Sequence, residues 1–506
     1  MSYAQSEGRP VAGSDAGGHG GGALRRHVVE LMSSGGVFAL GLVISRLASI
    51  ALLPAYTRFL TPADYGVMTI LDLVQEVLRL ALGSAFLASA GRLHFDSESE
   101  DRRARVWWVA LLAVTGLTIL VTAPLALLSP MMARLSFGPD FQGGAGLFSL
   151  MLVSLCFGLP ELLLQAHLRT IKRASLLVGL SLARLAANAT LNVSLLYFLR
   201  LGVAAVLWGN LITAIVFLAV HLGIFVKVRG RVRVDLGLLP QIAHFGGPMI
   251  GVALISLAMH QIDRYFLVNY VSLTEVGLYS FAYAIGQGIN SLVLYPFGQV
   301  WAVTVFDIAR MRQSRRVFAE VFSAFVRGLT LVILAASLAA GPAVELLATP
   351  AYARAADFVP IIALAYLFFS LDDHFRVPAL LQKRTSSMLP VYALTLGLNV
   401  ALNAVLVPRW GAAGAAWATV FTFIGFSCFG LVRYRRIERI DYPLADALMV
   451  VGSAVAAFIA FEVVFRNSGF AAHAAGGIVI WAGLAAVYSI RPLRAWRQLE
   501  GSALAS

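Results

Sequence analysis

The chain has 506 residues, of which 59% are apolar and 13% are charged, and its formal net charge is +13. Soluble proteins average about 25% charged residues, so this composition excludes an ordinary soluble domain and indicates a polytopic membrane protein. The positive charge does not indicate a nucleic-acid-binding surface, because the basic residues fall in short clusters between apolar runs. With two cysteines, Cys156 and Cys428, no disulfide framework is expected.

The chain begins with a segment rich in Gly and Ser that lacks an apolar core. This composition is not that of a signal peptide or of a folded domain. We therefore predict that residues 1–34 form a disordered cytoplasmic tail.

Apolar segments long enough to cross a bilayer as helices occupy most of the remaining chain. About 14 transmembrane helices are predicted by this pattern. Their expected ranges are 35–56, 66–90, 106–129, 146–168, 175–198, 203–226, 245–268, 276–300, 319–343, 359–380, 389–407, 411–432, 446–465 and 472–490.

Lys and Arg are concentrated in alternate connections between these segments. One set carries clusters such as Arg102, Arg103 and Arg105, whereas the alternate turn RFLTPADYG carries Arg58 alone. The positive-inside rule then predicts that both termini are cytoplasmic, including the tail 491–506, and that the number of spans is even. The basic connection 227–244 is expected to be a cytoplasmic interfacial linker.

The sequence repeats itself at an offset of about 211 residues, at which Gly66 aligns with Gly277, Asn188 with Asn399 and Asn192 with Asn403. Two six-helix lobes in the same orientation are therefore expected, an N-lobe at 35–226 and a C-lobe at 245–432. The last two helices, in 433–490, fall outside the repeat and are expected to be peripheral. Transporters built from such repeats bind substrate between the two halves.

Several charged residues interrupt the first two predicted helices. Asp72, Glu76 and Arg79 share one helical face, and Arg46 lies on the preceding helix without a carboxylate within one turn. Each charge would cost about 2.5–3.5 kcal/mol near the bilayer centre unless it faces protein or water. Asp72, Glu76 and Arg79 are therefore either a charge cluster that packs the helices together or an acid–base set that faces a lumen. Arg46 is the best single candidate for contact with an anion.

Later predicted helices carry further charges. Arg184, Asn188 and Asn192 form a stripe on one helix, where interhelical hydrogen bonding is expected of the Asn residues. Asp263 and Arg264 are sequence neighbours and are expected to point apart, so that each needs a partner elsewhere. Asp373 lies in another helix, in the segment DDHFR.

Motifs for enzyme chemistry are absent from the sequence. It contains no metal-spaced His/Cys set, no nucleophile elbow and no phosphate-binding Gly loop, and the connections are too short for a soluble catalytic domain. A function within the membrane, without a cofactor and without enzymatic activity, is expected.

Three stretches resemble the Wzx-type polysaccharide exporters of the multidrug/oligosaccharidyl-lipid/polysaccharide (MOP) superfamily. They are ISRLASIALLPAYTRFLTPADYG, QIDRYFLVNYVSLTEVGLYSFAYAI and LNAVLVPRWGAAGAAWATVF, and the resemblance extends over residues 35–490. It implies a MATE-like fold and a flippase that moves undecaprenyl-diphosphate-linked oligosaccharide across the bacterial inner membrane by alternating access. The pathway would be the biosynthesis of exopolysaccharide, capsule or the O-antigen of lipopolysaccharide.

The resemblance also implies roles for particular residues. Arg46, Arg79, Arg184 and Arg264 are the candidates for a cationic substrate-binding lumen, where Arg suits phosphate because its planar fork binds bidentately. Asp72, Glu76, Asp263 and Asp373 are the candidates for coupling to a proton or sodium gradient. The implied partners are the lipid-linked oligosaccharide, membrane lipids, and the polysaccharide polymerase and chain-length machinery, with no nucleic acid.

Three alternative functions remain at this point. A lipid II flippase would share the fold, and a drug/cation antiporter of the same superfamily would need an acidic lumen with aromatic walls. A membrane-embedded glycan polymerase or ligase would need a large outer loop with catalytic groups, which the sequence lacks.

Overall fold

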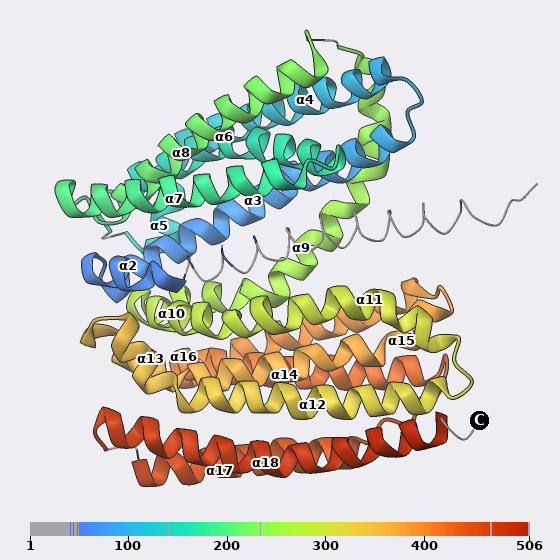
Figure 1. Cartoon of the computed structure of the whole chain (residues 1–506). Helices are drawn as coiled ribbons and strands as arrows, with labels where there is room; N and C mark the ends of the chain where they lie inside the picture. The colour runs from blue at the N-terminus through green and yellow to red at the C-terminus, as the bar shows by residue number, and fades with distance from the viewer. Residues whose placement is uncertain are drawn as a thin grey trace, which may run out of the picture.

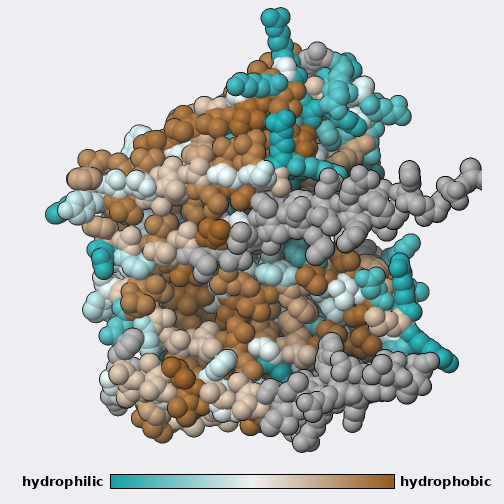
Figure 2. Space-filling view, viewed as in Figure 1, coloured by the Kyte–Doolittle hydropathy of each residue, from teal (hydrophilic) through white to brown (hydrophobic). Residues whose placement is uncertain are grey.

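The computed structural model describes residues 50–503 except 140, 233, 466 and 467, together with residues 41, 44 and 48. Helices account for all the regular structure in this part of the chain. Ten of them are long and apolar enough to cross a membrane, so the chain is a multi-pass membrane protein. In Figure 2 hydrophobic residues cover the middle of the molecule, and hydrophilic residues gather towards one end.

The N-lobe is a bundle in which α3 packs against α4 and α6, and α8 packs against α6 and α7. Its helices are α2 (Leu53–Phe59), α3 (Pro62–Phe95), α4 (Glu100–Leu127), α5 (Ser129–Phe137), α6 (Gly144–Thr170), α7 (Ala174–Leu199) and α8 (Val203–Arg229).

The C-lobe is a second bundle built around α14 and α16 (Figure 1). Its elements are α10 (Leu273–Ile289), the π-helix η2 (Asn290–Leu294), α11 (Tyr295–Ala309), α12 (Ser314–Leu338), α13 (Ala340–Leu347), η3 (Pro350–Asp357), α14 (Val359–Phe375), α15 (Val377–Leu381), η4 (Thr385–Met388) and α16 (Leu389–Arg435). The last helices, α17 (Leu444–Phe465) and α18 (Phe470–Ala503), pack on α12 at the outer side of this bundle.

A single long helix, α9 (Leu239–Tyr270), joins the two lobes after the short helix η1 (Leu236–Leu238). Near its start it is bonded to the N-lobe, since Ser89 Oγ donates to the carbonyl oxygen of Ile242 at 2.8 Å. Further along it packs against α16 in the C-lobe. The helix therefore begins six residues before the predicted start at 245 and crosses from one bundle to the other (Figure 1).

Capping residues set where the helices of the two lobes begin. Thr61 and Asp64 form a capping box at the start of α3, with Pro62 in the first turn. Ser272 caps α10 by accepting a hydrogen bond from the backbone N–H of Glu275, 211 residues after Asp64. Helix α3 consequently starts four residues earlier than the apolar run alone predicts.

The turn between the last two helices of each lobe also repeats. Gly202 has φ 56° and ψ −133°, and Gly411 has φ 56° and ψ −134°. Positive φ favours glycine because it has no Cβ. The two predicted helices 389–407 and 411–432 are thus the two arms of α16, which bends at Gly411.

The lobes meet at one end of the molecule, which we call the closed end, and diverge towards the other (Figure 1). At the closed end α3 and α10 cross with their backbones in contact. A Cβ on Gly66 would overlap the carbonyl oxygen of Leu273, and a Cβ on Gly277 would overlap that of Pro62.

Hydrogen bonds between the lobes close the same end. Thr57 Oγ1 donates to the carbonyl oxygen of Leu347 at 3.1 Å, and the Tyr352 hydroxyl donates to that of Leu60 at 3.0 Å. Because these bonds join backbone and side chains of different lobes, any separation of the lobes at this end must break them.

The substitution Gly277→Ala is expected to favour a conformation in which the closed end is open. The added methyl group would overlap the backbone of α3, which cannot move without separating the two helices. The distance between spin labels at the exposed positions Phe59 and Leu346, one in each lobe, should become longer. Gly298→Ala is the control, since a Cβ there has no atom within 4 Å. An unchanged distance distribution in Gly277→Ala would show that the glycine contact does not hold the lobes together.

Candidate functional site

A cavity of about 420 Å³ lies between the lobes near the closed end. Its polar lining residues are Tyr56 on α2, Tyr65 and Asp72 on α3, Gln287 on α10 and Ser291 on η2. Ile50, Leu53, Met68, Ala284 and Gly288 complete the lining. Both lobes therefore contribute side chains to one compartment.

The polar face of α3 divides into two parts. Asp72 lines the cavity, and in the part of the chain that the structure describes its carboxylate has no hydrogen-bond or ion-pair partner. Glu76 and Arg79 form an ion pair with 2.5 Å between Arg79 Nη2 and Glu76 Oε2, and 44% of the Arg79 side chain is exposed. Of the predicted cationic residues, Arg79 thus keeps an accessible guanidinium, whereas Arg46 lies outside the described residues.

Arg184 is engaged inside the N-lobe. Its Nε lies 2.9 Å from Oε1 of Glu161 on α6, a carboxylate whose side chain is 1% exposed. Gln165 donates to the same oxygen at 2.9 Å, and His221 Nδ1 lies 3.9 Å from it. This cluster joins α6, α7 and α8. In it, Arg184 is the counter-ion of a buried carboxylate, that of Glu161.

Asp263 and Arg264 form a buried pair in the C-lobe. Arg264 Nη1 folds back to Asp263 Oδ1 at 2.8 Å and also donates to the carbonyl oxygen of His260 at 3.0 Å. The guanidinium lies 4.3 Å from the ring centroid of Tyr283, and the Tyr279 hydroxyl donates to the other Asp263 oxygen. The expectation that these neighbours point apart is wrong, because the long Arg side chain reaches back along its own helix turn.

Asp373 is paired as well. Its carboxylate is hydrogen-bonded to Arg376 one turn along, and Arg376 Nη1 also lies 3.8 Å from Asp372 Oδ2. The adjacent His374 is fully buried among the rings of Trp301 and Phe325. The group therefore belongs to the core of the C-lobe near the end of α14.

The Asn pairs perform the bonding between helices that the sequence predicts. Asn188 donates to Asn210 at 2.8 Å, and Asn192 donates to the Tyr56 hydroxyl at 3.0 Å. In the C-lobe Asn399 donates to Thr422 at 3.2 Å, the counterpart of the Asn188–Thr213 contact at 3.5 Å. Hydrogen bonding between helices is thus confirmed for Asn188, Asn192 and Asn399, whereas Asn403 donates to Asn399 of its own helix. Asn192 also positions a tyrosine of the cavity.

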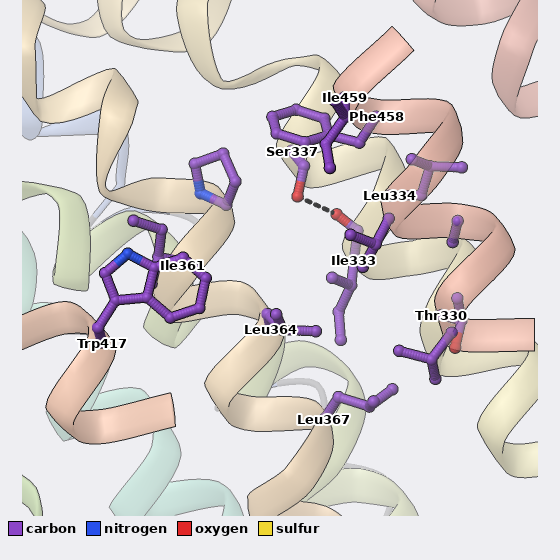
Figure 3. A pocket seen from close by; sticks show the side chains of 14 residues that line it. Thr330, Ile333, Leu334, Ser337, Ile361, Leu364, Leu367, Trp417, Phe458 and Ile459 are labelled. Atoms are coloured by element: carbon purple, nitrogen blue, oxygen red, sulfur yellow. Dashed lines mark hydrogen bonds between the residues drawn. The ribbon is translucent and has the colours of Figure 1, made fainter. Parts of the chain in front are cut away.

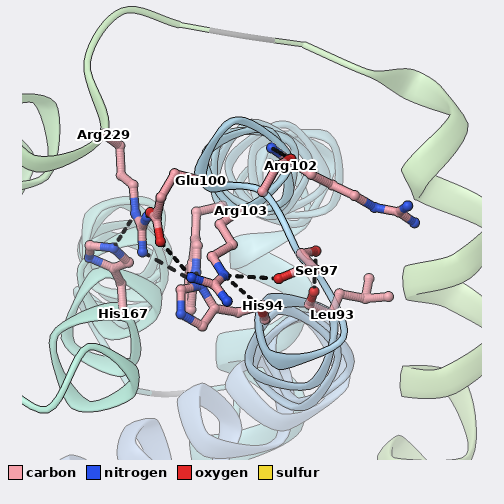
Figure 4. Close-up of polar contacts among 10 residues, drawn as sticks. Leu93, His94, Ser97, Glu100, Arg102, Arg103, His167 and Arg229 are labelled. Atoms are coloured by element: carbon pink, nitrogen blue, oxygen red, sulfur yellow. Dashed lines mark hydrogen bonds and ion pairs between the residues drawn. The ribbon is translucent and has the colours of Figure 1, made fainter.

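A polar network at the opposite end of the N-lobe was not predicted from the sequence (Figure 4). Arg229 on α8 donates to Nε2 of His167 at 2.9 Å and lies 2.7 Å from Glu100 Oε2. Arg103 binds the other Glu100 oxygen at 2.5 Å, and Trp107 donates to His94 at 3.2 Å. The residues come from α3, α4, α6 and α8 and join these helices into one unit. They could not be grouped from the sequence, because they are spread over three connections.

A second pocket, of about 190 Å³, is apolar and lies between α12, α14, α16 and α17 (Figure 3). Of its two hydroxyl groups, Ser337 donates to the carbonyl oxygen of Ile333 in its own helix. The pocket lacks the polar groups that a glycan or a phosphate requires. Among the described residues, no group of three or more His, Cys, Asp or Glu side chains is arranged to hold a metal ion.

The arrangement of two helical lobes is similar to that of solved membrane transporters. The chain superposes on the lipid II flippase MurJ in an inward closed conformation with a TM-score of 0.69, at 11% identity, over 89% of this chain and 98% of that one. An inward-facing multidrug resistance MATE transporter of the MOP superfamily gives a TM-score of 0.56 at 14% identity, over 86% of this chain and 99% of that one.

The family follows from the sequence match. Residues 55–357 match the model of the polysaccharide biosynthesis protein family, so the chain belongs to that family. No curated protein matches the chain by sequence.

Substituting Arg184→Gln is expected to destabilise the protein, because Glu161 would remain buried without its cation. Loss of a partner to a buried polar group costs about 1–3 kcal/mol, and more for a charge. The double variant Arg184→Gln/Glu161→Gln removes the orphaned charge and should recover most of the stability. Thermal unfolding of the purified protein and its abundance in the membrane measure both effects.

If Arg184→Gln kept wild-type stability but lost transport, Arg184 would instead be a residue of the substrate path.

Proposed function

We propose that the chain is a flippase for undecaprenyl-diphosphate-linked oligosaccharide in the cell inner membrane. The observation that carries the proposal is the polar cavity between the lobes of this polysaccharide biosynthesis protein, closed at one end by the glycine crossing. A lipid-linked glycan is polar and anionic at its head, so it needs a compartment of this kind to cross the hydrocarbon.

The two lobes would be the moving bodies of alternating access. In this proposal about 14 helices span the membrane, with six in each lobe and two at the periphery, and both termini are cytoplasmic. The closed end, which carries few basic residues, would face the periplasm, and the end with the Arg clusters would face the cytoplasm. The conformation would then be inward-facing, ready to take substrate from the inner leaflet.

The contacts narrow the set of residues proposed to bind the diphosphate. Arg184 and Arg264 pair with carboxylates that are almost fully buried. Glu76, the partner of Arg79, is 28% exposed. Arg79 is half-exposed on the face that leads from the cavity, and Arg46 remains a candidate from its place in the sequence. Arg46 and Arg79 are therefore the two arginines proposed to bind the diphosphate.

Coupling to an ion gradient also remains a proposal. Asp263, Asp373 and Glu76 each pair with an arginine of their own helix. Such pairs hold their charge in place and are poor sites for a cation that must bind and leave. A proton or sodium ion would therefore need Asp72 or a residue outside this set.

A deletion strain tests the proposed substrate. Cells lacking the gene should accumulate lipid-linked oligosaccharide on the inner leaflet, and the wild-type gene should restore polysaccharide at the surface. Accumulation of lipid II with unchanged polysaccharide would instead make the protein a lipid II flippase. Normal levels of both, with new sensitivity to cationic drugs, would make it a drug antiporter.

In the same strain, Arg79→Lys is expected to reduce export about tenfold at normal protein abundance. Lys keeps the charge and can still pair with Glu76, but it cannot bind a diphosphate bidentately. Arg327→Lys is the control, because Arg327 pairs with Asp446 between α12 and α17, away from the cavity. Arg46→Lys is expected to behave like Arg79→Lys; undiminished export in either variant would remove that residue from the substrate path.

A further inference from the structure

The cavity between the lobes has a lining that suits a polyol better than an anion. Its described polar side chains offer two phenols, a carboxylate, an amide and a hydroxyl, and none of its described lining residues is Lys or Arg. A diphosphate placed against Asp72 would meet a like charge and, among the described lining residues, no fixed cation. The described lining therefore suits the uncharged part of the proposed substrate better than its diphosphate.

Two of these polar groups are uncommitted and open to the cavity. Asp72 and Gln287 are both exposed, and among the described residues neither side chain has a hydrogen-bond or ion-pair partner. They come from opposite lobes, α3 and α10, and line the same space. A ligand with several hydroxyl groups can donate to the carboxylate while it exchanges hydrogen bonds with the amide.

The aromatic residues of the lining are held in place by the protein. Tyr56 accepts a hydrogen bond from Asn192 at 3.0 Å, which leaves its own O–H free to donate. Tyr65 packs edge-on against Phe281 and Tyr352, with centroid separations of 6.0 and 6.2 Å. Fixed rings offer apolar surface to the C–H face of a sugar at little entropic cost.

The backbone of the C-lobe is irregular at this point. Helix α10 continues into the π-helix Asn290–Leu294, which begins three residues after Gln287, and Ser291 of that segment lines the cavity. π-Helical turns are rare and frequently occur at functional sites. The volume of about 420 Å³ also falls within the range of roughly 300–1,000 Å³ that small-ligand pockets have.

The cationic position lies farther from the closed end on the same helix. Helix α3 starts at the closed end with Pro62, so Arg79 follows Asp72 by seven residues towards the opening. This is about 10 Å along the helix axis. A phosphate at Arg79 would leave space for sugar residues between it and the closed end.

We propose that Tyr56, Tyr65, Asp72, Gln287 and Ser291 form a glycan subsite that holds the sugars of the lipid-linked substrate beyond its diphosphate. The proposal rests on the proposed function and adds an orientation to it. The glycan enters the cavity first and occupies the closed end, while the diphosphate stays at the level of Arg79. Opening of the glycine crossing then releases the sugar end first.

Two ligands separate the sugar contacts from the phosphate contacts. One is undecaprenyl diphosphate, and the other is the lipid-linked oligosaccharide extracted from cells that lack this transporter. Binding of both to purified protein in nanodiscs is measured for the wild type and for Asp72→Ala, Gln287→Ala and Arg79→Gln. Asn290→Ala is the matched control, since it removes an amide from the same helical region but does not line the cavity.

Asp72→Ala and Gln287→Ala are expected to weaken binding of the glycosylated ligand about tenfold each. Binding of undecaprenyl diphosphate should change less than about twofold, which is within the neutral range for a contact that is not made. Arg79→Gln should weaken both ligands by the same factor, and Asn290→Ala neither. Asp72→Ala and Gln287→Ala should keep the thermal unfolding midpoint of the wild type, because neither side chain has a described partner to lose.

Equal losses for both ligands in Asp72→Ala and Gln287→Ala, or no loss in either variant, would overturn the subsite. Unchanged glycan binding in Asp72→Ala together with loss of ion-driven transport would do the same and assign Asp72 to ion coupling. Failure of the wild type to bind either ligand would instead contradict the proposed function itself.

Discussion

The need to neutralise charge within the membrane governs how the two lobes are built. An unpaired charge near the bilayer centre costs about 2.5–3.5 kcal/mol, and the chain places several charged residues within its spans. Most are paired inside one lobe: Glu161 with Arg184, Asp263 with Arg264, and Asp373 with Arg376. These pairs make each lobe self-sufficient, so that the two can separate without exposing a charge to lipid.

The surface between the lobes follows the opposite rule. There the contacts include the backbone crossing at Gly66 and Gly277 and the packing of Tyr65 against Phe281. A few neutral hydrogen bonds, such as that from Tyr352 to Leu60, add to them. Neutral contacts of this kind can be exchanged for water at modest cost. Asp72, which lines the cavity, and the partly exposed Arg79 both lie on α3. A polar substrate can replace water in contact with these two side chains.

Much of the fold can be predicted from the sequence, because helix length, apolar runs and the offset repeat are one-dimensional signals. The described parts of the predicted helices are helical except for single-residue turns at Leu52, Leu128, Ala339 and Arg376. Asn188, Asn192 and Asn399 form the expected bonds between helices. The predicted helix ends are less accurate where a helix extends beyond its apolar run. This is so at Thr61, where a capping box starts α3, and at Leu239, where α9 begins.

The site was harder to predict, since it depends on which side chains reach one another. Spacing along a helix identified the polar face of α3 but could not show that Arg264 folds onto its neighbour Asp263 or that Glu161 reaches Arg184 on the next helix. Tyr56, Tyr65 and Ser291 gave no signal, because isolated tyrosines and serines are common in such helices. They became part of a site only when two lobes enclosed them.

Transport by purified protein in proteoliposomes tests the account most directly. Lipid-linked oligosaccharide is placed in one leaflet, and its arrival in the other is followed with a membrane-impermeant sugar-modifying reagent, with and without a thiol cross-linker joining Thr57→Cys to Thr349→Cys across the closed end. The account predicts translocation that the cross-link stops and that reduction restores. Translocation that continues at the same rate with the closed end cross-linked, or no translocation beyond that of protein-free liposomes, would contradict it.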